Sequence, residues 1–262
     1  MFKTHPEMSR SYRIVADCFM SLTFLWLLQS AFSDDNHKAT PGGSFSEGLF
    51  ASSLSLSSNV YYHGPRDVKK IALTIDDGWV NDQPLLNLLV SYGITCTVFI
   101  PGIVAEKKPD FIRSLDALGF EVCNHSYSHR ILTGLSSEEI LKEIRDGQAA
   151  ITKITGKRYP YFRPSGGKIN DKVLAAAASE GYAVILWDSD ALGYWPDRPL
   201  ETQLDNLRTH LMNGNIILSH FGAKLRTCEV LQIFIPECLK QGYSFVTVTE
   251  LLSVSKDAFS TR

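Results

Sequence analysis

The sequence predicts an α/β domain in which parallel strands and helices alternate, with a barrel favoured over an open sheet. From residue 70 onward, short runs rich in β-branched residues alternate with amphipathic stretches of about ten to twenty residues, the pattern of repeated βα units. Polar side chains follow several different strands, as in barrels, where reactive groups come from the carboxyl ends of many strands. An open sheet would concentrate its site at one switch point, often with a glycine-rich phosphate loop, and the sequence has no such loop.

The expected strands are short, and a glycine lies a few residues before most of them, as helix C-termini prefer. Ser136 and Glu139 form a capping box that opens a long helix toward Thr155, and Asn170 can cap a helix over Val173–Glu180. The seven expected strands are Ile71–Ile75, Thr95–Ile100, Phe120–Asn124, Tyr161–Arg163, Ala183–Trp187, Ile216–Ser219 and Ser244–Thr247.

The beginning of the chain has the layout of an export signal. Lys3, Arg10 and Arg13 precede a mostly apolar run that ends in small residues, so residues 1–33 are expected to be a signal peptide and the protein to be secreted or associated with the cell envelope. An uncleaved membrane anchor is the alternative, although the run is short for a span of ~20 apolar residues.

Composition predicts a linker over residues 34–59 and one folded domain over 60–262. The linker is rich in Ser and Gly and has little periodic apolar content. With 44% hydrophobic and 21% charged residues, the chain can bury a full core. A net charge of −2 without a dense Lys/Arg run excludes nucleic acid and an anionic membrane surface as expected partners.

Cysteine spacing does not match a metal site. Cys96 and Cys123 lie in strand-like runs and are expected to be buried thiols, while a disulfide between Cys228 and Cys238 stays open as an option after export.

The first expected strand runs directly into Asp76, Asp77 and Gly78. Successive side chains of a strand point to opposite faces, so the two carboxylates are expected to have different targets. A plain Asp-Asp-Gly turn is the alternative, because these residue types also favour turns.

Two histidines follow the third expected strand at positions i and i+4. If Asn124 caps one helical turn there, His125 and His129 become neighbours on one face. Together with Asp77 from a neighbouring strand end, they approach a three-ligand metal site whose fourth position stays open for water.

Four motifs, in this order, resemble those of the polysaccharide deacetylase family, also called the NodB homology or carbohydrate esterase 4 domain. The resemblance implies a distorted (β/α)7 barrel, a divalent metal such as Zn2+ or Co2+, and removal of N-acetyl groups from amino-sugar glycans such as peptidoglycan or chitin-like oligomers. The motifs are Thr74–Gly78, His125–His129, Arg163–Gly167 and Leu218–His220, and the implied metal ligands are Asp77, His125 and His129.

The resemblance also implies roles for three other residues. Asp76 would be the general base, and His220 the general acid that protonates the leaving amine. Arg163 would hold the Asp76 carboxylate in two places and keep it ionised.

The third and fourth motifs depart from the family pattern. The third usually reads Arg-x-Pro-Tyr-Gly, with the Tyr N–H at the oxyanion, and here Gly166 takes the place of that Tyr. The fourth usually reads Asp-x-x-Asp-Trp, and here Gly193 replaces its second Asp. Asp190, or else Asp188, is expected to supply the missing carboxylate and Trp195 the missing ring, with ordinary strand-edge and loop roles as the alternative.

These departures keep two other functions open beside N-acetyl hydrolysis. One is hydrolysis of a different amide, such as a cyclic ureide, on the same barrel. The other is glycan binding by a pseudoenzyme, which the lost second Asp favours and the complete Asp-His-His set opposes.

Overall fold

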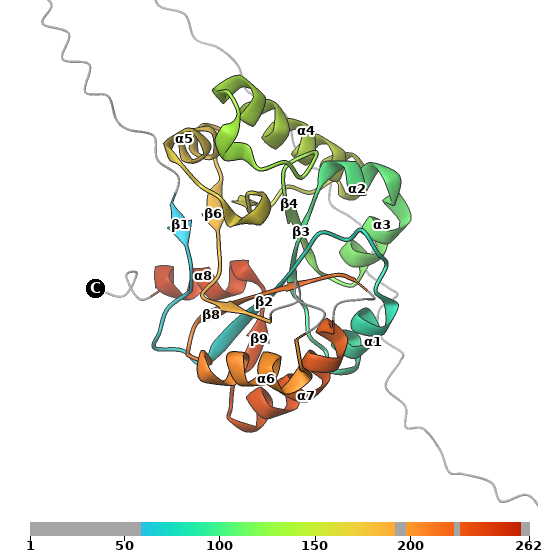
Figure 1. The fold of residues 1–262 in the computed structure, drawn as a ribbon, viewed down its shortest axis with the longest axis vertical. Coiled ribbons are helices and arrows are strands. Elements are labelled where there is room, and N and C mark those ends of the chain that lie inside the picture. The colour runs from blue at the N-terminus through green and yellow to red at the C-terminus, as the bar shows by residue number, and fades with distance from the viewer. Residues whose placement is uncertain (1–58, 192–197, 223–225, 258–262) are drawn as a thin grey trace, which may run out of the picture. The chain divides into compact units, whose positions relative to one another are not determined.

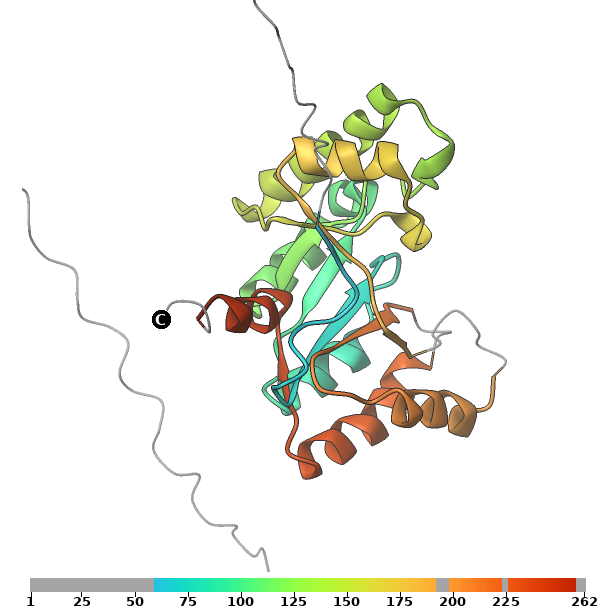
Figure 2. The same cartoon turned by 90° about the vertical axis from the view of Figure 1, so that its left-hand side faces the viewer.

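The predicted α/β barrel is confirmed by the computed structural model, which describes residues 59–191, 198–222 and 226–257. One sheet of parallel strands curls around the interior, and the helices lie on its outside (Figures 1 and 2). The strand order is β1-β6-β5-β4-β3-β2-β8-β7, and β9 pairs with the first residues of β2. The strands are β1 Val60–Tyr61, β2 Lys70–Asp76, β3 Thr97–Ile100, β4 Glu121–Asn124, β5 Tyr161–Phe162, β6 Ala183–Ile185, β7 Ser189–Asp190, β8 Asn215–His220 and β9 Ser244–Val246.

The barrel is distorted where the chain passes from β6 to β7. Sequence analysis predicted one strand over Ala183–Trp187, but β6 ends at Ile185, and the chain then leaves β5 and joins β8. The Asp188 N–H donates to Ile216 O at 3.3 Å, and β7 continues this pairing. Strands β6 and β7 therefore connect the two ends of the sheet, and β7, like β1, was missed by sequence analysis.

Side chains of β2 alternate between the barrel interior and the helices outside. Ile71, Leu73 and Ile75 belong to the cluster that packs against the surrounding helices. Ala72 belongs to the interior cluster, so Thr74 and Asp76, at the same two-residue period, continue the inner row. The last inward residue of the strand is thus a carboxylate at the carboxyl end of the barrel.

The helices begin and end largely where the capping signals predicted. The capping box of Ser136 and Glu139 is present, and the long helix behind it ends at Gly156 in the left-handed conformation. Asn170 caps its helix by accepting from the Val173 N–H. The α-helices are α1 Gln83–Ser91, α2 Gly102–Lys107, α3 Pro109–Ala117, α4 Ser137–Thr155, α5 Asp171–Ser179, α6 Leu200–Thr209, α7 Thr227–Lys240 and α8 Val248–Asp257, with 3-10 turns η1 Leu132–Gly134 and η2 Ser165–Gly167.

Cys96 and Cys123 are buried free thiols, as expected. The Cys228–Cys238 disulfide is excluded, because both residues are free and lie ten residues apart on α7, about 15 Å along its axis.

Among the residues that the structure describes, no helix is long and apolar enough to cross a membrane. The predicted signal or anchor over residues 1–33 and the linker up to residue 58 lie outside those residues.

Helix α4 packs closely on the chain that follows β4, and Gly147 makes this approach feasible. A Cβ atom at position 147 would lie 2.6 Å from Asn124 Oδ1 and 2.7 Å from Ser126 O. We expect Gly147→Ala to lower the free energy of unfolding by about 1–3 kcal/mol, because the overlap outweighs the ~1 kcal/mol that alanine gains over glycine in a helix.

Denaturant titration checks this expectation. The control is Ala149→Gly at an exposed position of the same helix, where propensity alone costs about 1 kcal/mol. A Gly147→Ala protein that is more stable than the parent would contradict the packing argument.

Candidate active site

Polar side chains from four strands meet at the carboxyl end of the barrel. Asp76 and His220 end β2 and β8, while His125 and Arg163 directly follow β4 and β5. The register brings the strand ends together, since Asp76 pairs with His220. A cavity of about 330 Å3 lies here, lined by Asp76, His125, His129, Ile131, Gly166, Gly167, Trp187, Asp190, Leu218 and His220.

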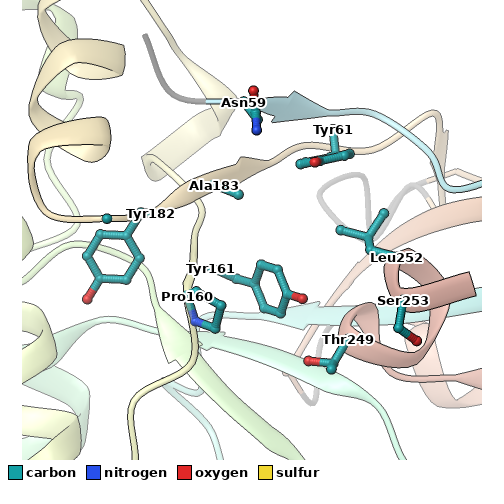
Figure 3. A pocket seen from close by; sticks show the side chains of 10 residues that line it. Asn59, Tyr61, Pro160, Tyr161, Tyr182, Ala183, Thr249, Leu252 and Ser253 are labelled. Carbon is teal, nitrogen blue, oxygen red and sulfur yellow. The ribbon is translucent and has the colours of Figure 1, made fainter. Parts of the chain in front are cut away.

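A second hollow, of about 390 Å3, lies where Tyr161 and Ala183 begin β5 and β6 (Figure 3). Tyr61, Tyr161 and Tyr182 contribute to its wall, and no predicted site residue lines it. The cavity at the carboxyl ends of the strands is therefore the candidate active site.

Arg163 is completely buried and donates to Asp76 from inside the barrel. Its Nη1 lies 2.6 Å from Asp76 Oδ1 and 2.9 Å from Thr74 Oγ1. Its Nε and Nη2 donate to Ile185 O at 2.9 Å and Leu186 O at 3.1 Å. The predicted two-point grip on Asp76 is wrong, because the other donors satisfy carbonyls at the end of β6. The predicted partnership itself is present.

Asp77, His125 and His129 form a group of potential metal ligands. One ligand atom from each lies within 4.8 Å of the other two. Asp77 Oδ1 is 3.2 Å from His129 Nε2 and 3.9 Å from His125 Nε2.

Asp76 and Asp77 differ in their main targets, as predicted, but they do not point to opposite faces. Asp76 Oδ2 lies 3.6 Å from His125 Nε2, so both carboxylates approach the same ring. The reason is that Asp77 follows the strand and has a φ of 80°, which interrupts the strand alternation.

The two histidines are brought together by a loop and not by the predicted helical turn. We call residues 125–130 the histidine loop. Ser126 and His129 have φ angles of 63° and 62°, and the two imidazole centroids are 4.9 Å apart. Asn124 caps no helix here, because it ends β4 and its Nδ2 donates to Ile144 O at 2.8 Å.

The residues fit a divalent cation by the chemistry of their donor set. His125 Nδ1 lies 2.6 Å from Arg163 O, so that nitrogen carries the proton and Nε2 presents its lone pair toward Asp77. Burial lowers the pKa of His125 well below its usual value and also lowers the pKa of His129. Both rings are therefore neutral near pH 7, the form that binds metals such as Zn2+ or Co2+.

His220 lies in the same cavity, and its pKa is lowered to about 4. Burial is the main cause, and the nearby Asp76 carboxylate opposes it. Two carboxylates were candidates for tuning this residue. Asp190 lines the cavity, whereas Asp188 accepts from Asn215 Nδ2 and the Ile216 N–H at the start of β8, away from the site.

The glycine-rich third motif forms one wall of the cavity. Gly166 lines the cavity with a φ of 62°, and the Ser165 hydroxyl lies 3.2 Å from that of Ser126 in the histidine loop. Gly167 contacts Trp187 so closely that a Cβ there would lie 2.6 Å from the ring. The backbone at both glycines is left-handed, which favours glycine.

Besides Ile131, sequence analysis missed Trp187 as a residue of the cavity wall. It was assigned to the end of a strand, but the break after β6 turns it into the cavity wall. The only available signal was an aromatic residue just before Asp188 and Asp190. Gly193 and Trp195, the residues of the altered fourth motif, lie outside the described part of the chain.

Comparisons with known proteins agree with this geometry. Residues 63–185 match the polysaccharide deacetylase family. Over 210 residues the chain is 33% identical to a peptidoglycan-N-acetylglucosamine deacetylase of Bacillus cereus, covering 78% of this chain and 98% of the relative.

Two solved structures share the fold. A peptidoglycan N-acetylglucosamine deacetylase matches with a TM-score of 0.71 at 25% identity, over 75% of this chain and 94% of that chain. A pseudoenzyme of the carbohydrate esterase 4 family from Bacillus anthracis matches with a TM-score of 0.70 at 27% identity, over 74% of this chain and 69% of that chain.

The low pKa of His220 predicts acid-sensitive stability in the metal-free protein. The fold favours neutral His220, whereas the unfolded chain titrates near pH 6.5, so its contribution is complete above about pH 6.5 and is lost as the pH falls toward 4. We expect a loss of up to about 3 kcal/mol from this residue, measured by denaturant titration in chelator between pH 7.5 and 4.

His220→Gln tests the assignment, since glutamine does not titrate. We expect a flatter stability–pH curve for this variant, with the remaining slope due partly to His125, whose pKa is also lowered. Identical slopes for parent and variant would contradict it.

Proposed function

The chain belongs to the polysaccharide deacetylase family, and on that premise we propose that it removes N-acetyl groups from amino-sugar glycans at the carboxyl end of its barrel. The observation that carries this proposal is a single site that contains three potential metal ligands, a carboxylate held by a buried arginine, and a histidine opposite it. Such a set supplies each group that metal-assisted amide hydrolysis needs.

Asp77, His125 and His129 would hold the metal. One carboxylate oxygen and two imidazole nitrogens suit Zn2+ and also Co2+, and three protein ligands leave a position for water or substrate. When bound, such an ion lowers the pKa of a water molecule and polarises the acetyl carbonyl.

Asp76 would act as the general base and His220 as the general acid. Asp76 takes a proton from the attacking water, whose oxygen forms a bond to the acetyl carbon. His220 gives a proton to the glycan nitrogen as the C–N bond breaks, so acetate and a free amine leave. Arg163 orients Asp76, and the Gly166 N–H is proposed to donate to the oxyanion.

His220 must carry a proton to act as an acid, and burial works against this. Asp76 raises its pKa, and we propose that Asp190, which lines the same cavity, adds to this effect. In this proposal Asp190 replaces the second aspartate of the family's fourth motif. In the same proposal, Trp187, which lines the cavity, supplies the aromatic ring that sequence analysis expected from Trp195.

We propose a peptidoglycan-like substrate and a location outside the cell. The Bacillus cereus relative is named a peptidoglycan-N-acetylglucosamine deacetylase, and residues 1–33 have the layout of an export signal. Glycan binding without turnover is a second candidate, because a pseudoenzyme shares the fold. Acetate release from a panel of acetylated glycans, with a cyclic ureide included, separates these functions.

Substitutions at two neighbouring positions separate metal binding from proton transfer. We expect His125→Ala to abolish stoichiometric Zn2+ binding and turnover, because it removes a ligand. We expect Asp76→Asn to retain the metal and to lose turnover about 10²–10⁴-fold, because the base is lost. Metal analysis of each purified variant and acetate release check both expectations.

Three results would redirect the proposal. If His125→Ala binds Zn2+ as tightly as the parent, the metal site is misassigned. If Asp76→Asn loses the metal, the roles of Asp76 and Asp77 are exchanged. If the parent binds metal and glycan without releasing acetate, it is a pseudoenzyme.

A matched pair of substitutions tests the tuning of His220. We expect Asp190→Asn to move the alkaline limb of the rate–pH profile to lower pH by about 1–3 units, as loss of a close ion pair does. Asp188→Asn should leave the limb in place, since that carboxylate is bound at the start of β8. Equal shifts in both variants, or none in either, would exclude Asp190 from this role.

A further inference from the structure

Glu143 of helix α4 accepts hydrogen bonds from the backbone of the histidine loop, and we propose that it is the positioning residue that sets the metal affinity of the site. Within the described chain, Glu143 does not line the cavity, and its hydrogen bonds go to Tyr127 and Ser128 rather than to a potential ligand atom. The inference rests on the proposed function, because it assumes that the histidines of this loop hold a metal.

Both oxygens of the Glu143 carboxylate accept from the histidine loop. Oε2 accepts from the Tyr127 N–H at 3.1 Å and from the Ser128 N–H at 2.8 Å. Oε1 accepts from the Ser128 hydroxyl at 2.6 Å and lies 3.4 Å from Arg130 Nε. One side chain therefore contacts Tyr127 and Ser128, which lie between the two histidines, and Arg130, which directly follows the second.

These bonds are strong because the carboxylate is buried. Only 8% of the Glu143 side chain is exposed, and hydrogen bonds to an ionised acceptor are roughly twice as strong as neutral ones. A buried carboxylate is costly without partners, and here the loop supplies them. The helix and the loop thus depend on each other.

Helix α2 also holds the histidine loop. The Gly102 and Ile103 N–H groups donate to Ser126 O at 2.9 Å and Tyr127 O at 3.0 Å. Helix α2 therefore binds carbonyls of the loop, while Glu143 binds its N–H groups. This division fixes the backbone between the histidines, including the left-handed residue Ser126.

His129 depends on this support more than His125 does. The His125 ring is fixed directly through Nδ1 and Arg163 O and is 2% exposed. The His129 side chain is 23% exposed, and the residue itself has a left-handed backbone directly after Ser128. The Ser128 contacts of Glu143 thus determine where the His129 Nε2 lies relative to Asp77.

We expect loss of these bonds to weaken metal binding by about 10–100-fold, the effect typical of groups that orient metal ligands. Glu143→Ala removes every acceptor. Glu143→Gln keeps one amide oxygen that can accept from both N–H groups, so it should restore affinity to within about fivefold of the parent. Asp146→Ala, which removes an exposed carboxylate from the same helix, should leave affinity unchanged.

The measurement is a Co2+ titration followed by visible absorption, with Zn2+ competition, on purified full-length protein at a temperature where circular dichroism shows each variant folded. A loss confined to stability would lower the unfolding temperature of the metal-free protein but leave the bound Co2+ spectrum and its affinity unchanged. A positioning role changes both the affinity and the spectrum.

Two outcomes would overturn the inference. One is that Glu143→Ala binds Co2+ with an affinity within threefold of the parent's and with the same spectrum. The other is that Glu143→Gln binds Co2+ as weakly as Glu143→Ala does. If Glu143→Ala does not fold, Glu143→Asp takes its place, because it keeps the charge but is one methylene too short to reach the loop. We expect Glu143→Asp to bind at least tenfold more weakly, and parent-like binding would overturn the inference.

The parent protein separates this inference from the proposed function. If the parent binds no Co2+ or Zn2+, the proposed metal site itself fails. If the parent binds them and every Glu143 variant binds them equally well, only the positioning role fails.

Discussion

Arg163 is the largest fully buried side chain in the described part of the chain, and the interior of the barrel is arranged around its charge. Removal from water lowers its pKa, and Asp76 opposes this effect. Breaking such a pair by removing one partner typically costs about 3–5 kcal/mol, because the other charge stays buried. The same pair that stabilises the interior therefore fixes the orientation of the proposed base, so stability and catalysis cannot be separated at these two residues.

The same arginine accommodates the distortion of the barrel. Where β6 ends, the carbonyls of Ile185 and Leu186 lose their place in the sheet, and Arg163 donates to both. A buried carbonyl without a partner is costly, so the arginine makes the break tolerable. The break then lets the chain cross to β8 and turns Trp187 and Asp190 toward the cavity.

Local sequence signals correctly predicted the local features of the structure. The capping box at Ser136, the Asn170 cap and the strand that ends at Asp76 depend on neighbouring residues, and each is present. Spacing alone suggested a helical turn between His125 and His129. The chain forms a loop instead, because contacts from α2 and α4 stabilise left-handed residues that no local pattern reveals. The same limit explains why Trp187 was missed, since its exposure to the cavity depends on pairing with β8, far along the chain.

The order of the motifs along the chain has a consequence for how the barrel assembles. Asp77, His125 and His129 all lie between β2 and the start of α4, so the potential metal ligands can meet once β2, β3 and β4 have paired. His220 joins them only when β8 pairs with β2. In this pairing the Thr74 hydroxyl donates to Ile217 O, and these two residues lie 143 positions apart in the sequence. Contacts this distant form late, because closing a long loop costs entropy before it gains any contact. An ion captured by the first half of the barrel would therefore stabilise a chain that has not yet closed, and metal supply during folding would influence the yield of the finished protein.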